Sequence, residues 1–305
     1  MIPAARGVAA CAWLLSLAWT LTSHADSAPS RLPLVVDGHE LALWTKSAAR
    51  PSATLLLVHG RTWSSLPNFD LDTADGDRSV FDAFVRRGYA VYALDLRGYG
   101  ASPRDTTGWL TPTRAVADVR AALDRIAARH PRIAVRPALI GYSRGAQVAV
   151  MVAQQDSRAA SALVLFGFPP GVRQTSTPEI DTPPRAATTA TAAAEDFITP
   201  GAATPALIDA YVKAALAADP VRVDWRGESE FRFEPATIAT PTLMIYGVND
   251  PFRNAASAAF FDALASRDRA YVVLPESDHA AHVENSAQAW VHAIDGFLKS
   301  PRAKE

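Results

Sequence analysis

Apolar residues along the chain form short runs that alternate between a strand pattern and a helix pattern. Residues 32–46 predict two strands joined at Asp37-Gly38, a dipeptide typical of tight hairpin turns. Later runs are apolar without interruption, which favours strands buried on both faces of a sheet. These runs are residues 53–58, 89–94, 138–140, 162–166, 241–247 and 270–275.

Helix patterns lie between these strands. Thr111-Pro112 predicts a helix start, with a capping hydroxyl followed by proline at the first helical position. Apolar residues then recur at spacings of three and four, as in one face of a helix. Further helices are predicted at residues 80–87, from residue 144 onward, and at 205–217, 254–266 and 285–298. Strands alternating with helices predict an α/β fold, a mostly parallel twisted sheet with helices on both faces.

The alternation stops between residues 169 and 240, a stretch rich in Pro, Thr and Ala. A disordered linker of this length would carry few aromatic residues. This stretch has several: Phe197, Tyr211, Trp225, Phe231 and Phe233. We therefore expect a partly mobile lid at residues 169–240, inserted into a core formed by residues 26–168 and 241–305.

The N-terminal residues 1–25 have the layout of a secretory signal peptide. A basic start precedes the apolar residues 7–21, and cleavage is expected after Ala25. The apolar stretch is shorter than the roughly 20 residues of a membrane-spanning helix. A lipobox-like sequence ends at Cys11, but most of the apolar stretch follows it. We expect a periplasmic or secreted protein with no membrane anchor after cleavage.

The composition argues against several classes of partner and chemistry. The chain of 305 residues has 30 basic and 31 acidic side chains and a net charge of −1, so no nucleic-acid partner is expected. Cys11 is the only cysteine, which leaves the mature chain without disulfides or thiol chemistry. Residues 70–77 offer four carboxylates, but their spacing differs from that of a calcium-binding loop. We therefore predict a polar loop at residues 61–77 and no metal site. The sequence indicates no oligomeric state.

Ser143 stands at the point where a predicted strand gives way to a predicted helix. Gly141 and Gly145 flank it in the pattern G-x-S-x-G. A sharp turn at this point lifts a serine above the sheet, and the N-terminus of the following helix points at whatever the serine attacks. The pattern predicts a nucleophile.

A serine nucleophile needs a base and an acid, which in this arrangement follow it in the order acid and then histidine. Asp250 comes directly after the strand at 241–247, and His279 shortly after the strand at 270–275. Both would then lie at the same edge of a parallel sheet as Ser143. His282 is an alternative base, and Asp95 an alternative acid, although Asp95 precedes the serine.

The chain resembles the α/β-hydrolase family over nearly all of its mature length. The resemblance rests on His59-Gly60, on DLRGYG at 95–100, GYSRG at 141–145 and GVND at 247–250, and on DHAAHVE at 278–284. It favours His279 over His282 as the base, and it implies that Asp95 and His59 are structural. It also implies an oxyanion hole made by the backbone N–H groups of Arg61 and Arg144. Asp278 departs from the family, which usually has glycine at this position.

The resemblance implies a serine hydrolase that cleaves a carboxylic ester of a small molecule through an acyl-enzyme, without a cofactor. Lactonase, amidase and cofactor-free perhydrolase activities remain alternatives, as does a binding protein that has lost catalysis. Aromatic residues are expected to line the substrate cleft, and those of the lid to set acyl-chain preference unless they only pack the lid on the core. They are Tyr142, Tyr211, Trp225, Phe231 and Phe233.

Overall fold

The computed structural model describes residue 1 and residues 27–73, 76–171 and 181–301, so the expected signal peptide and Cys11 lie outside the described residues. Its centre is one eight-stranded sheet. β2 runs antiparallel to both of its neighbours, and the remaining strands are parallel, as predicted. The spatial order is β1 (Ser30–Val36), β2 (His39–Ser47), β6 (Tyr89–Leu94), β3 (Ala53–Val58), β8 (Ala138–Tyr142), β9 (Leu163–Phe166), β11 (Thr242–Gly247) and β12 (Arg269–Leu274).

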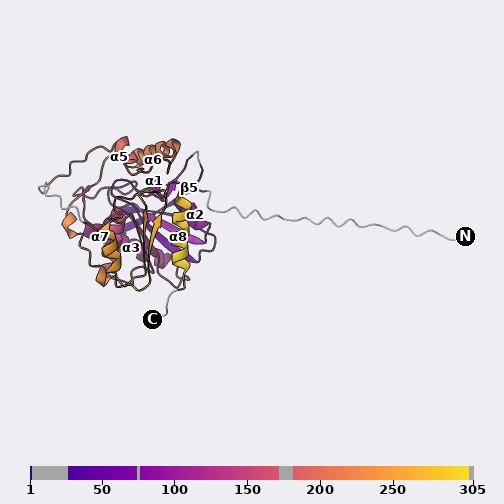
Figure 1. Cartoon of the computed structure of the whole chain (residues 1–305). Helices are drawn as coiled ribbons and strands as arrows, with labels where there is room; N and C mark the ends of the chain where they lie inside the picture. The colour runs from indigo at the N-terminus through magenta and orange to yellow at the C-terminus, as the bar shows by residue number, and fades with distance from the viewer. Residues whose placement is uncertain (2–26, 74–75, 172–180, 302–305) are drawn as a thin grey trace.

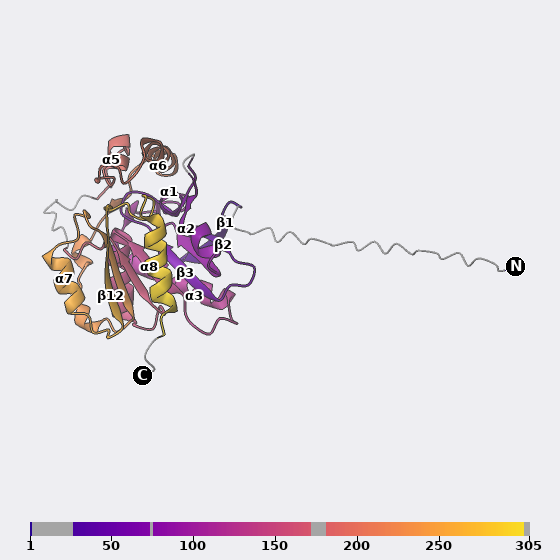
Figure 2. The same ribbon diagram turned by 45° about the vertical axis from the view of Figure 1, so that its right-hand side comes forward.

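Helices cover both faces of the sheet (Figures 1 and 2). Alternate residues of the central strands enter two separate apolar clusters, because side chains of a strand point to opposite faces. One cluster includes α3 (Pro112–Arg129), α4 (Arg144–Gln155) and the end of α7 (Ala255–Asp262). The other includes α2 (Val80–Val85) and α8 (Ala287–Lys299). The predicted start of α3 is confirmed, since the Thr111 side chain accepts a hydrogen bond from the N–H of Arg114.

The segment between β9 and β11 contains more regular structure than the single helix predicted for it. We call residues 169–240 the insertion. It contains α5 (Ala190–Ala194), α6 (Pro205–Ala218), β10 (Asp224–Trp225) and the 3-10 helices η2 (Glu228–Glu230) and η3 (Pro235–Thr237). Figure 1 shows α5 and α6 together at one end of the molecule. β10 pairs with β7 (Trp109–Leu110), which joins the insertion to the core.

The expectation of a polar loop at residues 61–77 is wrong for residues 65–71. This stretch contains the short helix α1 (Ser65–Phe69) and β4 (Asp70–Leu71), which pairs with β5 (Arg78–Ser79). Phe69 is buried in the core, and the Asp70 carboxylate accepts a hydrogen bond of 2.9 Å from Lys46 Nζ. Within the described residues no three His, Cys, Asp or Glu side chains are grouped to hold a metal ion. No helix of the described part is long and apolar enough to cross a membrane.

Candidate active site

Ser143 occupies a strained turn between β8 and α4. Its backbone has φ 52° and ψ −115°, and positive φ is uncommon for any residue with a side chain. The flanking glycines allow this turn. A Cβ at Gly141 would lie 2.5 Å from the backbone of the first turn of α4, and one at Gly145 would lie 2.3 Å from the carbonyl oxygen of Val58 in β3. Only glycine fits either position, so the sequence pattern has a steric cause.

Asp250 and His279 meet at the carboxyl ends of β11 and β12. Asp250 Oδ2 lies 3.0 Å from His279 Nδ1, and both side chains are buried. A Cβ at Gly167 would lie 2.6 Å from the imidazole, so the glycine makes room for the ring. Rings of Tyr142 and Phe252 pack against the imidazole, each with its centroid 5.0 Å away. These contacts hold Nδ1 toward the carboxylate, as a general base requires.

Charge around His279 alters its basicity. Burial alone lowers the pKa of His279, but the charge of Asp250 and the hydrogen bond to it act in the opposite direction. Asp196 and Asp278 add to the effect of Asp250, so the pKa of His279 is raised above its ordinary value. The protonated imidazole that forms when a base accepts a proton is therefore stabilised here.

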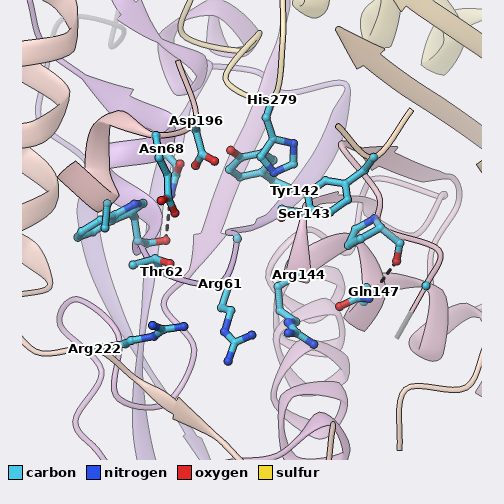
Figure 3. Close-up of a pocket in the computed structure, with 17 residues that line it drawn as sticks. Arg61, Thr62, Asn68, Tyr142, Ser143, Arg144, Gln147, Asp196, Arg222 and His279 are labelled. Atoms are coloured by element: carbon cyan, nitrogen blue, oxygen red, sulfur yellow. Dashed lines mark hydrogen bonds between the residues drawn. The ribbon is translucent and has the colours of Figure 1, made fainter. Parts of the chain in front are cut away.

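Ser143 and His279 line one cavity of about 320 Å³, shown in Figure 3. In this structure, which describes both residues, no hydrogen bond joins Ser143 Oγ to His279. Such bonds are often long before a substrate binds. Most of the other lining residues are polar: Arg61, Thr62, Asn68, Arg144, Gln147, Glu195, Asp196 and Arg222.

Arg61 and Arg144, whose backbone N–H groups the resemblance assigns to an oxyanion hole, both lie near Ser143. Arg144 is the first residue of α4, where N–H groups have no partner within the helix. Arg61 follows Gly60, where a Cβ would lie 3.4 Å from Ser143 Cβ, so this loop passes close to the serine. Both arginines line the cavity. Donors at these two positions would stabilise an oxygen that develops charge during attack by Ser143.

His59 and Asp95 hold the loops around the site together and do not line the cavity. His59 Nε2 accepts a hydrogen bond of 3.1 Å from the N–H of Leu96, and Nδ1 donates to the Gly60 carbonyl oxygen at 2.8 Å. Burial lowers the pKa of His59, which keeps the ring neutral. Asp95 accepts a hydrogen bond of 2.9 Å from the N–H of Ser65. Both side chains are structural in their contacts.

His282 lies away from the cavity, inside a cage of aromatic rings. Its ring centroid is 4.7 Å from that of Tyr142 and 5.2 Å from that of Phe166. Burial lowers the pKa of His282 to about 3, and the charge of His279 adds to this effect. His279 is therefore the histidine that faces Ser143.

Four of the five expected cleft aromatics lie elsewhere, so that expectation needs correction. Tyr142 lines the cavity, while Tyr211, Trp225, Phe231 and Phe233 do not. Trp225 and Phe231 are buried in the core cluster around α3 and α4, and Phe233 packs against the same cluster. The Tyr211 hydroxyl donates to Asn68 Oδ1 at 3.1 Å. These rings bury the insertion against the core, because joining the two requires apolar surface on the insertion.

Asp278 ties the catalytic loop to the insertion. Its Oδ2 accepts hydrogen bonds from the N–H groups of Ile198 at 2.8 Å and Thr199 at 2.6 Å. Its Oδ1 accepts one from the N–H of Ala280 at 3.1 Å, and the side chain is fully buried. The departure from glycine beside His279 thus supplies an acceptor for the insertion backbone. In the sequence, the only sign of this contact was the aspartate at a position where the family usually has glycine.

Asp196 brings a second acid into the cavity, and sequence analysis missed it. It follows α5 and lies beside His279 and Tyr142 in Figure 3. Burial raises the pKa of Asp196, although His279 acts in the opposite direction. No motif surrounds Asp196, because its position depends on how the insertion folds back over the sheet.

Two further acids of the insertion reach the loop that carries Arg61. Asp219 accepts hydrogen bonds from the N–H groups of Ser64 and Gly100, each at 2.8 Å. Glu228 forms ion pairs of 3.1 Å with both Arg61 and Arg144. The insertion therefore holds both sides of the candidate oxyanion hole.

Comparison with known proteins identifies the family. Residues 49–286 match the model of the serine aminopeptidase S33 family. No curated protein sequence matches the chain. Among solved structures, an esterase from Thermogutta terrifontis has 19% identity and a TM-score of 0.67, covering 88% of this chain and 98% of its own.

Two other solved structures have similar folds. Epoxide hydrolase A from Mycobacterium thermoresistibile has 19% identity and a TM-score of 0.63 over 90% of this chain and 100% of its own. A serine hydrolase involved in carbazole degradation has 18% identity and a TM-score of 0.62 over 89% and 99%. The chain belongs to the serine aminopeptidase S33 family and is a serine hydrolase of the α/β-hydrolase fold.

Proposed function

We propose that the protein is an esterase that uses Ser143, His279 and Asp250 as a catalytic triad. The observation that carries this proposal is the convergence of three loops, two of which line the cavity through Ser143 and His279. The strained serine follows β8, the acid follows β11 and the histidine follows β12, with His279 Nδ1 3.0 Å from Asp250 Oδ2. A structural serine needs neither a positive φ nor a buried histidine-acid pair beside it.

In the proposed reaction, Ser143 Oγ attacks the ester carbonyl carbon while His279 Nε2 takes the hydroxyl proton. Asp250 holds the imidazole and stabilises its charge. N–H groups of Arg61 and Arg144 donate to the oxyanion, and each such donor is typically worth about 10²–10³ in rate. His279 then gives the proton to the leaving alcohol, which leaves an acyl-Ser143. Water, deprotonated by His279, attacks this ester and releases the carboxylic acid. No cofactor takes part in these steps.

Activity on a panel of 4-nitrophenyl esters tests the proposal. We expect turnover with at least one acyl length, and Ser143→Ala should abolish it while circular dichroism shows an unchanged fold. The matched control is Ser161→Ala, because Ser161 follows α4 and does not line the cavity. No turnover on any ester with a folded protein, or equal turnover by Ser143→Ala, would refute an esterase. Two further assays test the alternatives. They measure the hydrolysis of lactones and the formation of peracetic acid from acetate and hydrogen peroxide.

Aminopeptidase activity is a second candidate, favoured by Asp196. This carboxyl lies in the cavity beside His279, where it can pair with a free α-amino group next to the scissile bond. The family that the chain belongs to is named for this activity. Amino-acid 4-nitroanilides distinguish the two candidates, since an aminopeptidase hydrolyses them only when the α-amino group is free. N-acetylated nitroanilides are the control.

We also propose that the protein is exported, on the basis of the apolar residues 7–21 and the site after Ala25. Expression of the full chain in a Gram-negative host, followed by intact-mass measurement of the periplasmic fraction, tests this. A mass that begins at Asp26 supports cleavage, and an uncleaved cytoplasmic chain contradicts it.

A further inference from the structure

Three arginine side chains line the cavity that contains Ser143: Arg61, Arg144 and Arg222. In Figure 3 they lie on one side of Ser143, while Asp196 and His279 lie on the other. They come from three separate parts of the chain, the loop after β3, the start of α4 and the segment after α6. We call these three residues the arginine wall.

The arginine wall carries more positive charge than its neighbours neutralise. Arg61 and Arg144 share one carboxylate, that of Glu228, at 3.1 Å each. One negative charge thus faces two positive ones. Arg61 Nε is also buried without a hydrogen-bond acceptor among the described residues. Rings of the insertion pack on the Arg144 guanidinium, with the Phe231 centroid 4.8 Å away, so this cation is held in place.

Arg222 adds a third cation. Its backbone is fixed, since its N–H donates to the Ala186 carbonyl oxygen at 2.8 Å and its own carbonyl oxygen accepts from Arg104 at 2.7 Å. Within the described part of the chain, the Arg222 guanidinium forms no ion pair. The arginine wall therefore has a surplus of two positive charges at the edge of a cavity whose nucleophile is uncharged.

Two acids line the same cavity, Asp196 and Glu195. Asp196 lies across Ser143 from the arginine wall, next to His279 (Figure 3). Glu195 also lines the cavity, and it is exposed as Arg222 is, so water screens the charges of both residues. The cavity is thus divided into a cationic side and an acidic side, and such a field orients a charged ligand.

We infer that the arginine wall binds a carboxylate of the substrate, so that the natural substrate is an ester that carries a free carboxylate group. This inference rests on the proposed esterase function and names its substrate class. Arginine suits the role because its planar guanidinium donates paired hydrogen bonds that match the geometry of a carboxylate. A carboxylate held there places the ester carbonyl at Ser143 in one orientation.

Two matched ester pairs test the inference, each differing only by methylation of the carboxylate. Mono-4-nitrophenyl glutarate and its methyl ester place the charge on the acyl side. 4-Acetoxybenzoate and methyl 4-acetoxybenzoate place it on the alcohol side. We expect kcat/KM for the charged member of one pair to exceed that of its neutral partner by about tenfold, because a charge-assisted hydrogen bond is lost on methylation. The advantage should shrink as salt is raised.

Variants of Arg222 show whether the arginine wall causes the preference. Arg222→Gln should reduce the ratio of charged to neutral kcat/KM by about tenfold, and Arg222→Lys, which keeps the charge, should retain part of it. The matched control is Arg132→Gln, an exposed arginine after α3 that does not line the cavity. It should leave the ratio as in the unmodified protein.

Binding to the Ser143→Ala protein gives a readout without turnover. Calorimetry with monoethyl glutarate and diethyl glutarate should show tighter binding of the monoester, and Arg222→Gln should remove the difference. If neutral esters are hydrolysed at least as well as charged ones in both pairs, or if Arg222→Gln leaves the ratio unchanged, the inference is wrong while the esterase function stands. If no ester of any kind is hydrolysed, the proposed function itself fails.

Discussion

The carboxylate of Asp219 accepts a hydrogen bond of 2.8 Å from the backbone N–H of Ser64. Asp219 follows α6 in the insertion, and Ser64 belongs to the loop that carries Arg61. A second link runs in parallel, because Trp225 Nε1 donates to the Tyr99 hydroxyl at 2.9 Å, and this hydroxyl donates to the Arg61 carbonyl oxygen. The insertion therefore shapes the proposed oxyanion hole from a distance.

Asp219→Asn should reduce turnover. The amide keeps the shape of the side chain but replaces one acceptor oxygen with a donor, which leaves one buried N–H without a partner. Such a loss costs about 1–3 kcal/mol and should loosen the loop that carries Arg61. We expect kcat on the best 4-nitrophenyl ester to fall by about tenfold, with a smaller change in KM.

Asp224→Asn is the control for this variant. Its carboxylate accepts from the N–H of Arg185 at 3.0 Å in the same insertion, away from the oxyanion loop. If both variants lower the melting temperature equally and kcat stays constant, Asp219 only supports the fold.

Replacing each histidine in turn shows which of the two is the catalytic base. His279→Ala should lower kcat by at least about 10³-fold, because Ser143 loses the group that takes its proton. His282→Phe keeps a ring inside the aromatic cage and should lower kcat by less than about tenfold. Steady-state kinetics of both variants on one ester decides the assignment. The opposite order of effects would make His282 the base.

The pH dependence of activity should respond to Asp196. His279 acts as a base only when neutral, so kcat/KM should rise with pH through a pKa that is raised above its ordinary value. Asp196→Asn removes one of the charges that raise this pKa, so the acid limb should move to lower pH. Asp209→Asn, an exposed acid on α6, is the control. An unmoved limb in Asp196→Asn would show that Asp196 does not act on the base.

Specificity for acyl length should depend on Phe252 and not on Phe233. Phe252 lines the cavity, whereas Phe233 packs against the core cluster. Phe252→Ala should change the ratio of kcat/KM between long and short acyl esters by about 1–3 kcal/mol. Phe233→Ala should lower the free energy of unfolding by about 2 kcal/mol and leave the ratio unchanged. Melting temperature and the ester profile, measured on both variants, test this. A changed ester profile in Phe233→Ala would show that aromatic residues of the insertion contact the substrate after all.

Sequence alone predicts the sheet, and it also picks out Ser143, Asp250 and His279, which the structure brings close together. Strands buried on both faces, such as β3 and β6, need unbroken apolar runs, and these runs are visible without a structure. Steric contacts require glycine at Gly141 and Gly145, so the turn at Ser143 also leaves a local pattern. Requirements that involve neighbouring residues can therefore be recognised from the spacing of residue types along the sequence.

Contacts between distant segments leave no such pattern. Asp196 and Arg222 reach the cavity only because the insertion folds back over the carboxyl edge of the sheet. The aromatic residues of the insertion argued against a disordered linker, but the surface that they cover depends on how the insertion folds over the core. Trp225 thus packs against Tyr99 and the core, although the amino-acid composition of the insertion was equally consistent with a place in the substrate cleft.

Intact-mass spectrometry after treatment with a fluorophosphonate shows whether Ser143 is an activated nucleophile. A phosphonate labels only a serine whose proton is removed by a neighbouring base. We expect one adduct per chain, mapped to Ser143 by peptide analysis, lost in Ser143→Ala and strongly slowed in His279→Ala. A folded protein that forms no adduct, or an adduct that persists on another residue in Ser143→Ala, would show that Ser143 is not the nucleophile.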